Sequence, residues 1–360
     1  MNHEALVECA YEALQNHPDL MGVDFGYKYV QGGSDGQTRC LRFFVKEKVG
    51  ADGLSPNQVL PNPLVLPAPF GEQATDVISL SPFDFPREGA PVHCKERTER
   101  FNPLRPGISV SHPGLGSGTL GALVVCQDTG ELAVLSAAHV LAGRFARKGD
   151  PIFQPGVLDH ADMEFDAIGY LEDWCLDEDG DAAIAVLNRT RMVEPELIDD
   201  RLAITAAATV ELGEVLTKSG HGSNGTRGKV DGVGRYKLTL DEQTYWLQGF
   251  RLVSDGGKLS DPGDSGALWY RERDGVCEGV GLHVDGDRLG DPQEFGIACH
   301  LPRVLERLRV RLLQPGEQER RRKPVFLPEN LAARVQSMWD EAQLVAVSEA
   351  RRRAIGRQAA

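Results

Sequence analysis

The sequence predicts a mostly β protein, and two features of the chain lead to that prediction. Between residues 116 and 313, short apolar runs alternate with glycine-containing turns. No long helical segment separates these runs, so the pattern favours an antiparallel barrel or sandwich over a parallel α/β sheet. The runs expected to form strands are 120–126, 132–136, 182–187, 215–218, 228–233, 245–252, 267–270 and 276–284.

The first ninety residues predict a small α+β module. Residues 3–17 have helical spacing of apolar positions and stop before Pro18, which indicates a short helix. β-Branched and aromatic residues are frequent at 22–29 and 39–49, on either side of a glycine-rich turn, which is typical of a hairpin. An extended connector at 56–69 and a strand at 76–80 complete the module.

The segments that flank the β region have a different composition. Proline and polar residues are frequent from 82 to 113, which indicates a linker, placed at 91–115. A closing helix is expected at 304–313, and a basic cluster at 320–323 then precedes an amphipathic helix from 329 to about 353. The expected division is therefore 1–90 for the N-terminal module, 91–115 for the linker, 116–313 for the β region and 314–360 for a basic helical extension.

Composition excludes several function classes. The net charge of −14 argues against affinity for nucleic acid or anionic membranes, because both need a basic surface. Residues 1–20 carry four acidic side chains where a signal peptide needs a basic start, and no apolar run approaches the length of a membrane span. The seven cysteines are odd in number and form no CxxC pair, which indicates reduced core thiols. We therefore expect a cytoplasmic protein without a bound metal.

The tetrapeptide Gly263-Asp264-Ser265-Gly266 indicates a candidate nucleophile. A serine hydroxyl is a weak nucleophile at neutral pH, so it needs a base for its proton and backbone donors for the oxyanion. Glycine at 263 and 266 permits φ values closed to other residues, which allows the amides of Gly263 and Ser265 to point at one spot. A plain Asp-Ser-Gly turn is the alternative explanation of the tetrapeptide alone.

A histidine and a carboxylate stand upstream in settings that suit a catalytic role. His139 follows an apolar run and two small residues, and its unperturbed pKa suits a general base. Asp181 stands at the mouth of a continuous apolar strand, where a carboxylate can fix the imidazole tautomer. A structural histidine remains the alternative for His139 considered alone.

The spacing of Asp177, Asp179 and Asp181 also suggests the opening of a calcium loop. Such a loop needs glycine and glutamate at positions where this chain has Ala182 and Asn188. The calcium interpretation therefore fails.

The chain order of His139, Asp181 and Ser265 resembles that of the trypsin/chymotrypsin-like serine peptidases. The matching motifs are Ser136-Ala137-Ala138-His139, Asp181-Ala182-Ala183-Ile184 and Gly263-Asp264-Ser265-Gly266-Ala267-Leu268. The resemblance implies two antiparallel six-stranded β barrels, with His139 and Asp181 on the first, Ser265 on the second and the catalytic cleft between them. It also implies that the amides of Gly263 and Ser265 form the oxyanion hole.

A narrower resemblance comes from residues 218–230 and 279–286. These segments are similar to a bacterial and plant subgroup typified by the NARROW LEAF-type peptidases. Residues 22–28 and 75–77 of the N-terminal module are similar to the same subgroup.

The chain departs from the wider family at two positions beside the candidate site. Secreted members pair the acid before the serine with a new N-terminus after zymogen cleavage, whereas this chain lacks that N-terminal motif. Asp264 must therefore find another partner. Val284 stands where many members have a serine that helps to hold the catalytic carboxylate, so Asp181 is expected to have one donor fewer.

The resemblance also implies a substrate pocket, formed by Leu259, His283, Val284, Asp285 and Gly286. Leu259 lies six residues before the nucleophile, at the base of the pocket, where a buried substrate cation would have no partner. Glutamate-specific members carry a histidine in the strand that contains His283, while Asp285 would repel an acid or attract a base. We expect apolar residues to be preferred, followed by acidic and then basic residues.

The function expected from these residues is that of an intracellular serine endopeptidase that acts through an acyl-enzyme without a metal or organic cofactor. Its partners would be protein or peptide substrates, with a regulatory protein or a second copy docking through the C-terminal helix. A latent, protease-shaped interaction module and an esterase are the alternatives.

Overall fold

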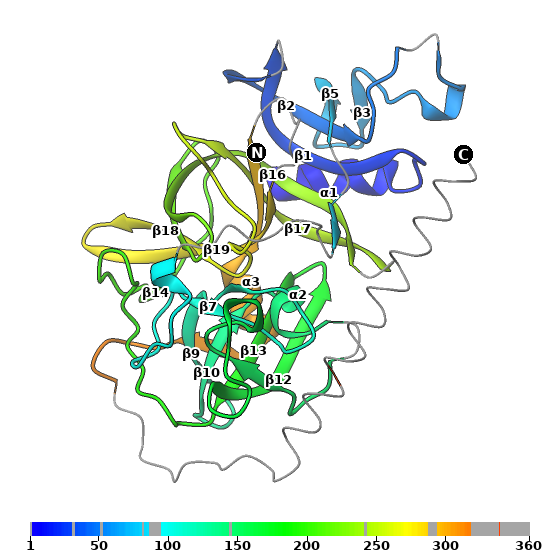
Figure 1. The fold of residues 1–360 in the computed structure, drawn as a ribbon. Coiled ribbons are helices and arrows are strands. Elements are labelled where there is room, and N and C mark those ends of the chain that lie inside the picture. Colours follow the sequence, from blue (N-terminus) through cyan, green and yellow to red (C-terminus); the bar gives the residue numbers. More distant parts are fainter. Residues whose placement is uncertain are drawn as a thin grey trace.

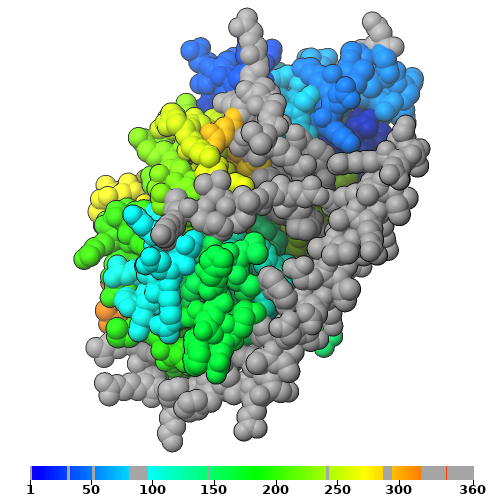
Figure 2. All heavy atoms as spheres, viewed as in Figure 1, coloured from blue at the N-terminus to red at the C-terminus, as the bar shows by residue number. Residues whose placement is uncertain are grey.

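The computed structural model describes residues 2–30, 33–50, 53–80, 83–85, 95–143, 146–240, 243–286, 294–317 and 338. Strands dominate these residues, and the expected mostly β fold is confirmed (Figure 1). The N-terminal module, a β barrel and a second β sheet follow one another along the molecule, as the blue, yellow-green and green-cyan regions of Figure 2 show.

The barrel near the middle of the molecule is a closed ring of six antiparallel strands. Its hydrogen-bonded order is β15-β18-β19-β20-β17-β16, and pairing of β15 with β16 closes the ring. The strands are β15 (Val215–Gly220), β16 (Asn224–Leu240), β17 (Gln243–Ser254), β18 (Leu268–Arg273), β19 (Val276–Gly286) and β20 (Phe295–His300). A closed ring leaves no unpaired edge among these strands.

The second β unit is a six-stranded antiparallel sheet with the order β11-β12-β13-β10-β9-β21. Its strands are β9 (Ala122–Cys126), β10 (Leu132–Ser136), β11 (Pro151–Phe153), β12 (Ala167–Asp177), β13 (Gly180–Leu187) and β21 (Val310–Leu312). β21 comes after the barrel strands in sequence, so the chain returns from the barrel to the sheet that contains β9 to β13.

Alternation along the apolar strands joins these two halves. Val124, Leu135 and Ile184 share one buried cluster with Leu282 and Val284 of the barrel. Their sequence neighbours on the same strands point into a separate cluster inside the first half. Because successive strand residues face opposite sides, one continuous apolar run can serve both clusters. The halves are therefore held together by a shared core.

The N-terminal module continues the barrel's sheet. Strand β1 (Leu20–Val30) pairs with β16 on one side and with β2 (Gly33–Val45) on the other, and β2 pairs with β5 (Thr75–Ser79). Helix α1 (His3–Leu14) begins at Asn2, whose side chain accepts from the backbone of Glu4 and Ala5, and it buries Leu6 against this sheet. The helix, the hairpin and the strand expected in this module are all present.

Short elements complete the described chain. They are η2 (Pro56–Gln58), β3 (Leu64–Leu66), β4 (Gly71–Gln73), β6 (Phe83–Phe85), η3 (Lys95–Arg97), β7 (Ser109–Val110), β8 (Gly118–Thr119), α2 (Ala138–Leu141), η4 (Val157–Asp159), β14 (Ala206–Ala207) and α3 (Leu301–Arg307). No helix among the described ranges is long and apolar enough to cross a membrane.

The closing helix differs from the expectation of a helix at 304–313. Helix α3 ends at Arg307, and Arg309 has a positive φ of 52°, so the chain turns there and continues as strand β21. Val310 and Leu312 are buried beside β9, and this burial outweighs the helical spacing of the segment. The basic cluster at 320–323 and the expected helix at 329–353 lie outside the described residues, apart from Met338.

Candidate active site

The imidazole of His139 is held by Asp181. β10 and β13 pair with Ser136 opposite Ala183, so the single-turn helix α2 that follows β10 lies beside the start of β13. His139 Nδ1 lies 2.6 Å from Asp181 Oδ2, and the His139 backbone N–H donates to Asp181 Oδ1 at 3.1 Å. Because the carboxylate accepts, Nδ1 carries the hydrogen and Nε2 keeps a lone pair.

The loop that carries Ser265 packs directly on the segment that carries His139. The backbone N–H of Thr119 donates to the Ser265 carbonyl at 2.8 Å. Gly266 has φ of +90°, and a Cβ there would lie only 2.2 Å from Ser136 Oγ and 3.0 Å from the Ala137 nitrogen. Glycine is therefore required at 266 for both its conformation and its close approach. The structure thus brings the His139 segment and the Ser265 loop together.

The Ser265 hydroxyl is not engaged with the histidine in this conformation. Its Oγ donates to the Val284 carbonyl at 3.2 Å. A hydroxyl has a single hydrogen, so the same hydrogen is not given to His139. A hydrogen bond from Ser265 to His139 would require rotation of the Ser265 side chain away from Val284.

The backbone around Gly263 has two N–H donors without an acceptor among the described residues. Gly263 has φ of +106°, in a region that L side chains rarely adopt. Within the described part of the chain, the N–H groups of Gly263 and Ser265 donate to no protein group. Both donors are consequently available to an oxygen that enters the site.

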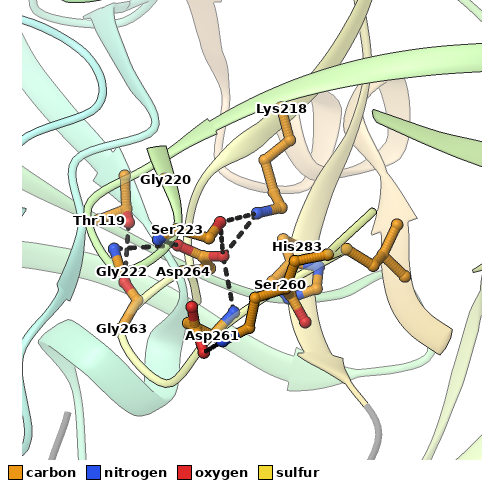
Figure 3. Close-up of polar contacts among 12 residues, drawn as sticks. Thr119, Lys218, Gly220, Gly222, Ser223, Ser260, Asp261, Gly263, Asp264 and His283 are labelled. Carbon is orange, nitrogen blue, oxygen red and sulfur yellow. Dashed lines mark hydrogen bonds and ion pairs between the residues drawn. The ribbon is translucent and has the colours of Figure 1, made fainter. Parts of the chain in front are cut away.

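Asp264 is the most heavily bonded carboxylate of the site (Figure 3). Its Oδ2 accepts from Lys218 Nζ at 2.6 Å, from the Ser223 hydroxyl and from the Asp261 N–H at 3.0 Å. Its Oδ1 accepts from the N–H groups of Gly222 and Ser223, each at 3.0 Å. The side chains of Asp264 and Lys218 have no exposure to solvent.

This surrounding keeps Asp264 ionised. Burial alone would raise the pKa of Asp264, but the Lys218 ammonium and the donors around it hold the pKa well below its usual range. Lys218 is the partner of Asp264, which the sequence alone did not identify. Three of the five donors come from Gly222 and Ser223 and bind the 220–223 turn to the loop that carries Ser265, so contacts within the chain set the conformation of this loop.

The expected pocket residues are buried, and two of them are neighbours. The Leu259 and His283 side chains both approach Gly296, where a Cβ would lie 3.4 Å and 3.1 Å from their nearest atoms. Trp269 Nε1 donates to His283 Nδ1 at 3.3 Å. Since the indole only donates, His283 carries its own hydrogen on Nε2.

The remaining pocket residues follow His283 on β19. Val284 is fully buried, and Asp285 Oδ1 accepts from the Gly286 N–H at 2.8 Å. A Cβ at Gly286 would lie 2.4 Å from Ser260 Oγ, so this strand and the 259–260 segment are in close contact. Glu294 holds that segment by accepting from the N–H groups of Leu259 and Ser260, which the sequence did not indicate.

Tyr245 is a second residue that sequence reasoning missed. It comes from β17 and packs against the shared core that contains Val284. Its hydroxyl is buried, and this burial, together with the negative charge of Asp181, raises the pKa of Tyr245 well above its ordinary value. A polar group thus lies near the Asp181 carboxylate, on a strand that the sequence indicated only as an apolar run.

A metal site has no support among the described residues. No three His, Cys, Asp or Glu side chains in those ranges lie close enough to hold a metal ion. Asp177 and Asp179, which gave the sequence its resemblance to a calcium loop, form ion pairs with Arg307 and Arg303, each at 3.2 Å.

Comparisons with known proteins gave structural matches alone. No protein-family model and no curated protein matches the chain. A Nocardiopsis protease matches with a TM-score of 0.45 and 13% identity, over 59% of this chain and 100% of its own. A glutamic acid specific serine protease matches at 0.45 and 16%, over 58% and 100%. A chymotrypsin of Cellulomonas bogoriensis matches at 0.43 and 14%, over 58% and 99%.

Proposed function

We propose that the chain is a serine endopeptidase of the trypsin/chymotrypsin-like type, related most closely to the NARROW LEAF-type subgroup. The observation that carries the proposal is the double hydrogen bond from His139 to Asp181, formed beside the loop that bears Ser265. This arrangement fixes the imidazole tautomer and leaves Nε2 as the proton acceptor.

In the proposed reaction, the Ser265 hydroxyl rotates from Val284 toward His139 and attacks the substrate carbonyl carbon. His139 Nε2 takes the serine proton, and the N–H groups of Gly263 and Ser265 donate to the oxyanion. His139 then gives the proton to the leaving amine as the peptide bond breaks. A water molecule then attacks the acyl-enzyme carbonyl, with His139 as the base. This step releases the carboxylic acid part of the substrate and restores the Ser265 hydroxyl.

The lysine behind the nucleophile loop supports an enzyme that needs no proteolytic activation. Lys218 pairs with Asp264 inside the chain, so the ion pair does not depend on a newly formed N-terminus. The described cysteines are free thiols, which supports a cytoplasmic location.

We propose the preference order apolar, acidic, then basic for the residue before the cleaved bond. Leu259 is fully buried and gives a substrate cation no partner. Second place for an acid rests on the resemblance to glutamate-specific members of the family, which carry a histidine in the strand that contains His283. Sequencing of the new ends after cleavage of a mixed peptide library tests the order, and predominant cleavage after arginine or lysine would overturn it.

The experiment that tests the function is turnover of an unfolded protein substrate by the wild-type chain and by three variants. Ser265→Ala, His139→Ala and Asp181→Asn should each lower kcat by several orders of magnitude while the thermal unfolding temperature is retained. Combining Ser265→Ala with His139→Ala should add little, because the residues act as a unit. Ser254→Ala, on β17, serves as the matched serine control.

A second candidate function is a latent, protease-shaped interaction module. The hydrogen bond from Ser265 Oγ to the Val284 carbonyl favours it, because the hydroxyl is then turned away from the base. Turnover equal to that of Ser265→Ala would support this candidate over the peptidase. An esterase would cleave an activated ester but leave the protein substrate intact.

A further inference from the structure

A second histidine lies under the nucleophile loop. His221 follows β15, has no exposure to solvent, and places Nδ1 2.7 Å from the Gly263 carbonyl oxygen. Because a carbonyl only accepts, Nδ1 carries a hydrogen and donates it to Gly263. The ring also packs against Gly263, where a Cβ would lie 2.5 Å from His221 Cε1.

The opposite side of the His221 ring faces a buried carboxylate. His221 Nε2 lies 3.6 Å from Asp159 Oδ2, and the Asp159 side chain is 1% exposed. Asp159 ends η4 and accepts a hydrogen bond from the hydroxyl of Ser109 on β7. Asp159 and Ser109 both precede the barrel in sequence, so the half that carries His139 also supports the ring of His221.

Thr119 supplies a second donor to the same carbonyl. Its hydroxyl donates to the Gly263 carbonyl at 2.8 Å and accepts from the His221 backbone N–H at 3.0 Å. Its own N–H donates to the Ser265 carbonyl at 2.8 Å. One residue of β8 therefore binds His221 and both ends of the Gly263–Ser265 segment.

We propose that His221, supported by Asp159 and Thr119, is a positioning residue for the oxyanion donors. Glycine at 263 has the widest choice of backbone angles, so its peptide groups need outside contacts to keep one orientation. Two donors on the Gly263 carbonyl oppose rotation of that peptide group, since rotation would leave a buried donor unpaired. The Gly263 carbonyl belongs to the Gly263–Asp264 peptide group, which adjoins the two peptide groups that carry the N–H groups of Gly263 and Ser265. Holding this central group restricts the directions in which both N–H groups can point at the substrate oxygen. This role rests on the proposed peptidase function.

The test compares His221→Asn with His221→Leu. An asparagine Nδ2 can take the place of histidine Nδ1 and donate to Gly263, whereas leucine fills the space without a donor. We expect His221→Leu to lower kcat about 100-fold with KM within about twofold, because one oxyanion donor is worth 10²–10³ in kcat. His221→Asn should stay within about tenfold of the wild type. Equal losses in the two variants, or a change in KM alone, would refute the role.

Thr119 provides an independent pair in case the His221 variants do not fold. Thr119→Val keeps the shape and removes the hydroxyl, while Thr119→Ser keeps the donor. The first should lower kcat and the rate of inactivation by a fluorophosphonate, and the second should restore most of both. Equal kcat in these two variants overturns the inference. Wild-type turnover no greater than that of Ser265→Ala means that the proposed function itself fails.

Discussion

Two of the buried clusters of charged side chains in this molecule differ in the backbone around them. Both pair carboxylates with cations, but one cluster lies on paired strands and the other lies in a loop. At the junction between the N-terminal module and the barrel, Arg42 donates to both oxygens of Asp24, and it shares Asp231 with Arg251. In the loop that carries Ser265, Asp264 pairs with Lys218. Burial would raise the pKa of Asp231, but Arg42 and Arg251 lower it, much as Lys218 does for Asp264.

The difference lies in what the backbone does around each cluster. The junction charges stand on β1, β2, β16 and β17, whose ladders already fix the chain, so the cluster adds stability and orientation. Asp264 lies in a loop between β17 and β18 that has no ladder of its own. Its conformation depends on side-chain contacts, so the site cluster should control activity more than stability.

Breaking the site cluster should have the largest effect. Lys218→Met leaves Asp264 buried without a cation, a state that costs about 3–5 kcal/mol unless the loop rearranges. Rearrangement of the loop is the easier response, so kcat should fall about 100-fold or more through loss of the oxyanion donors. The measurements are peptide turnover and thermal unfolding. Lys218→Arg, which keeps the charge, is the control, and full activity in Lys218→Met would contradict the role of the pair.

Breaking the junction cluster should lower the stability of the fold and leave kcat nearly unchanged. Arg42→Met removes the cation shared by Asp24 and Asp231, so the free energy of unfolding should fall by about 3–5 kcal/mol. The kcat of the protein that remains folded should stay within about twofold, because no junction residue contacts the site. Denaturant unfolding and turnover are measured on the same preparation. Unchanged stability together with lost activity would erase the distinction between the clusters.

Two tyrosines, one near each cluster, allow the same comparison with smaller expected effects. Tyr245 lies near Asp181 of the site, while Tyr236 donates to Asp24 of the junction at 2.8 Å. Tyr236→Phe breaks the hydrogen bond to Asp24 and should cost about 1 kcal/mol of stability. The Tyr245 hydroxyl is buried and has no hydrogen-bond partner among the described residues, so Tyr245→Phe should cost little stability, and its effect should appear as an altered pH profile of kcat. Identical behaviour of the two variants would argue against a role for Tyr245 at Asp181.

The sequence predicted those strands and turns that are marked by a local pattern of residues. Short apolar runs between glycines predicted strands such as Leu132–Ser136, and small residues around His139 and Ser265 marked the turns that carry them. Lys218 and His221 lie inside a segment chosen for its resemblance to a family, yet nothing local showed that one would pair with Asp264 and the other with Gly263. Those contacts join residues more than forty positions apart and exist only after the barrel closes.

The junction and its buried charges could not be predicted from the sequence for a related reason. β1 and β16 each have the composition of an ordinary strand, and their pairing is set by the shape of the complete sheet. Gly26 and Gly232 leave the space that the Arg42 side chain fills, since a Cβ at either would lie within 2.4 Å of its guanidinium. A glycine within a strand gives no indication of which distant side chain will approach it.

Covalent labelling of the nucleophile tests the central claim most directly. A fluorophosphonate reacts with a serine only where a base takes its proton and donors stabilise the phosphoryl oxygen. The wild-type chain should be labelled, with the mass of the adduct on the peptide that contains Ser265, and Ser265→Ala should not be labelled. Labelling of Ser265→Ala at the wild-type rate, or a wild-type chain that does not react at all, would contradict the assignment of Ser265 as an activated nucleophile.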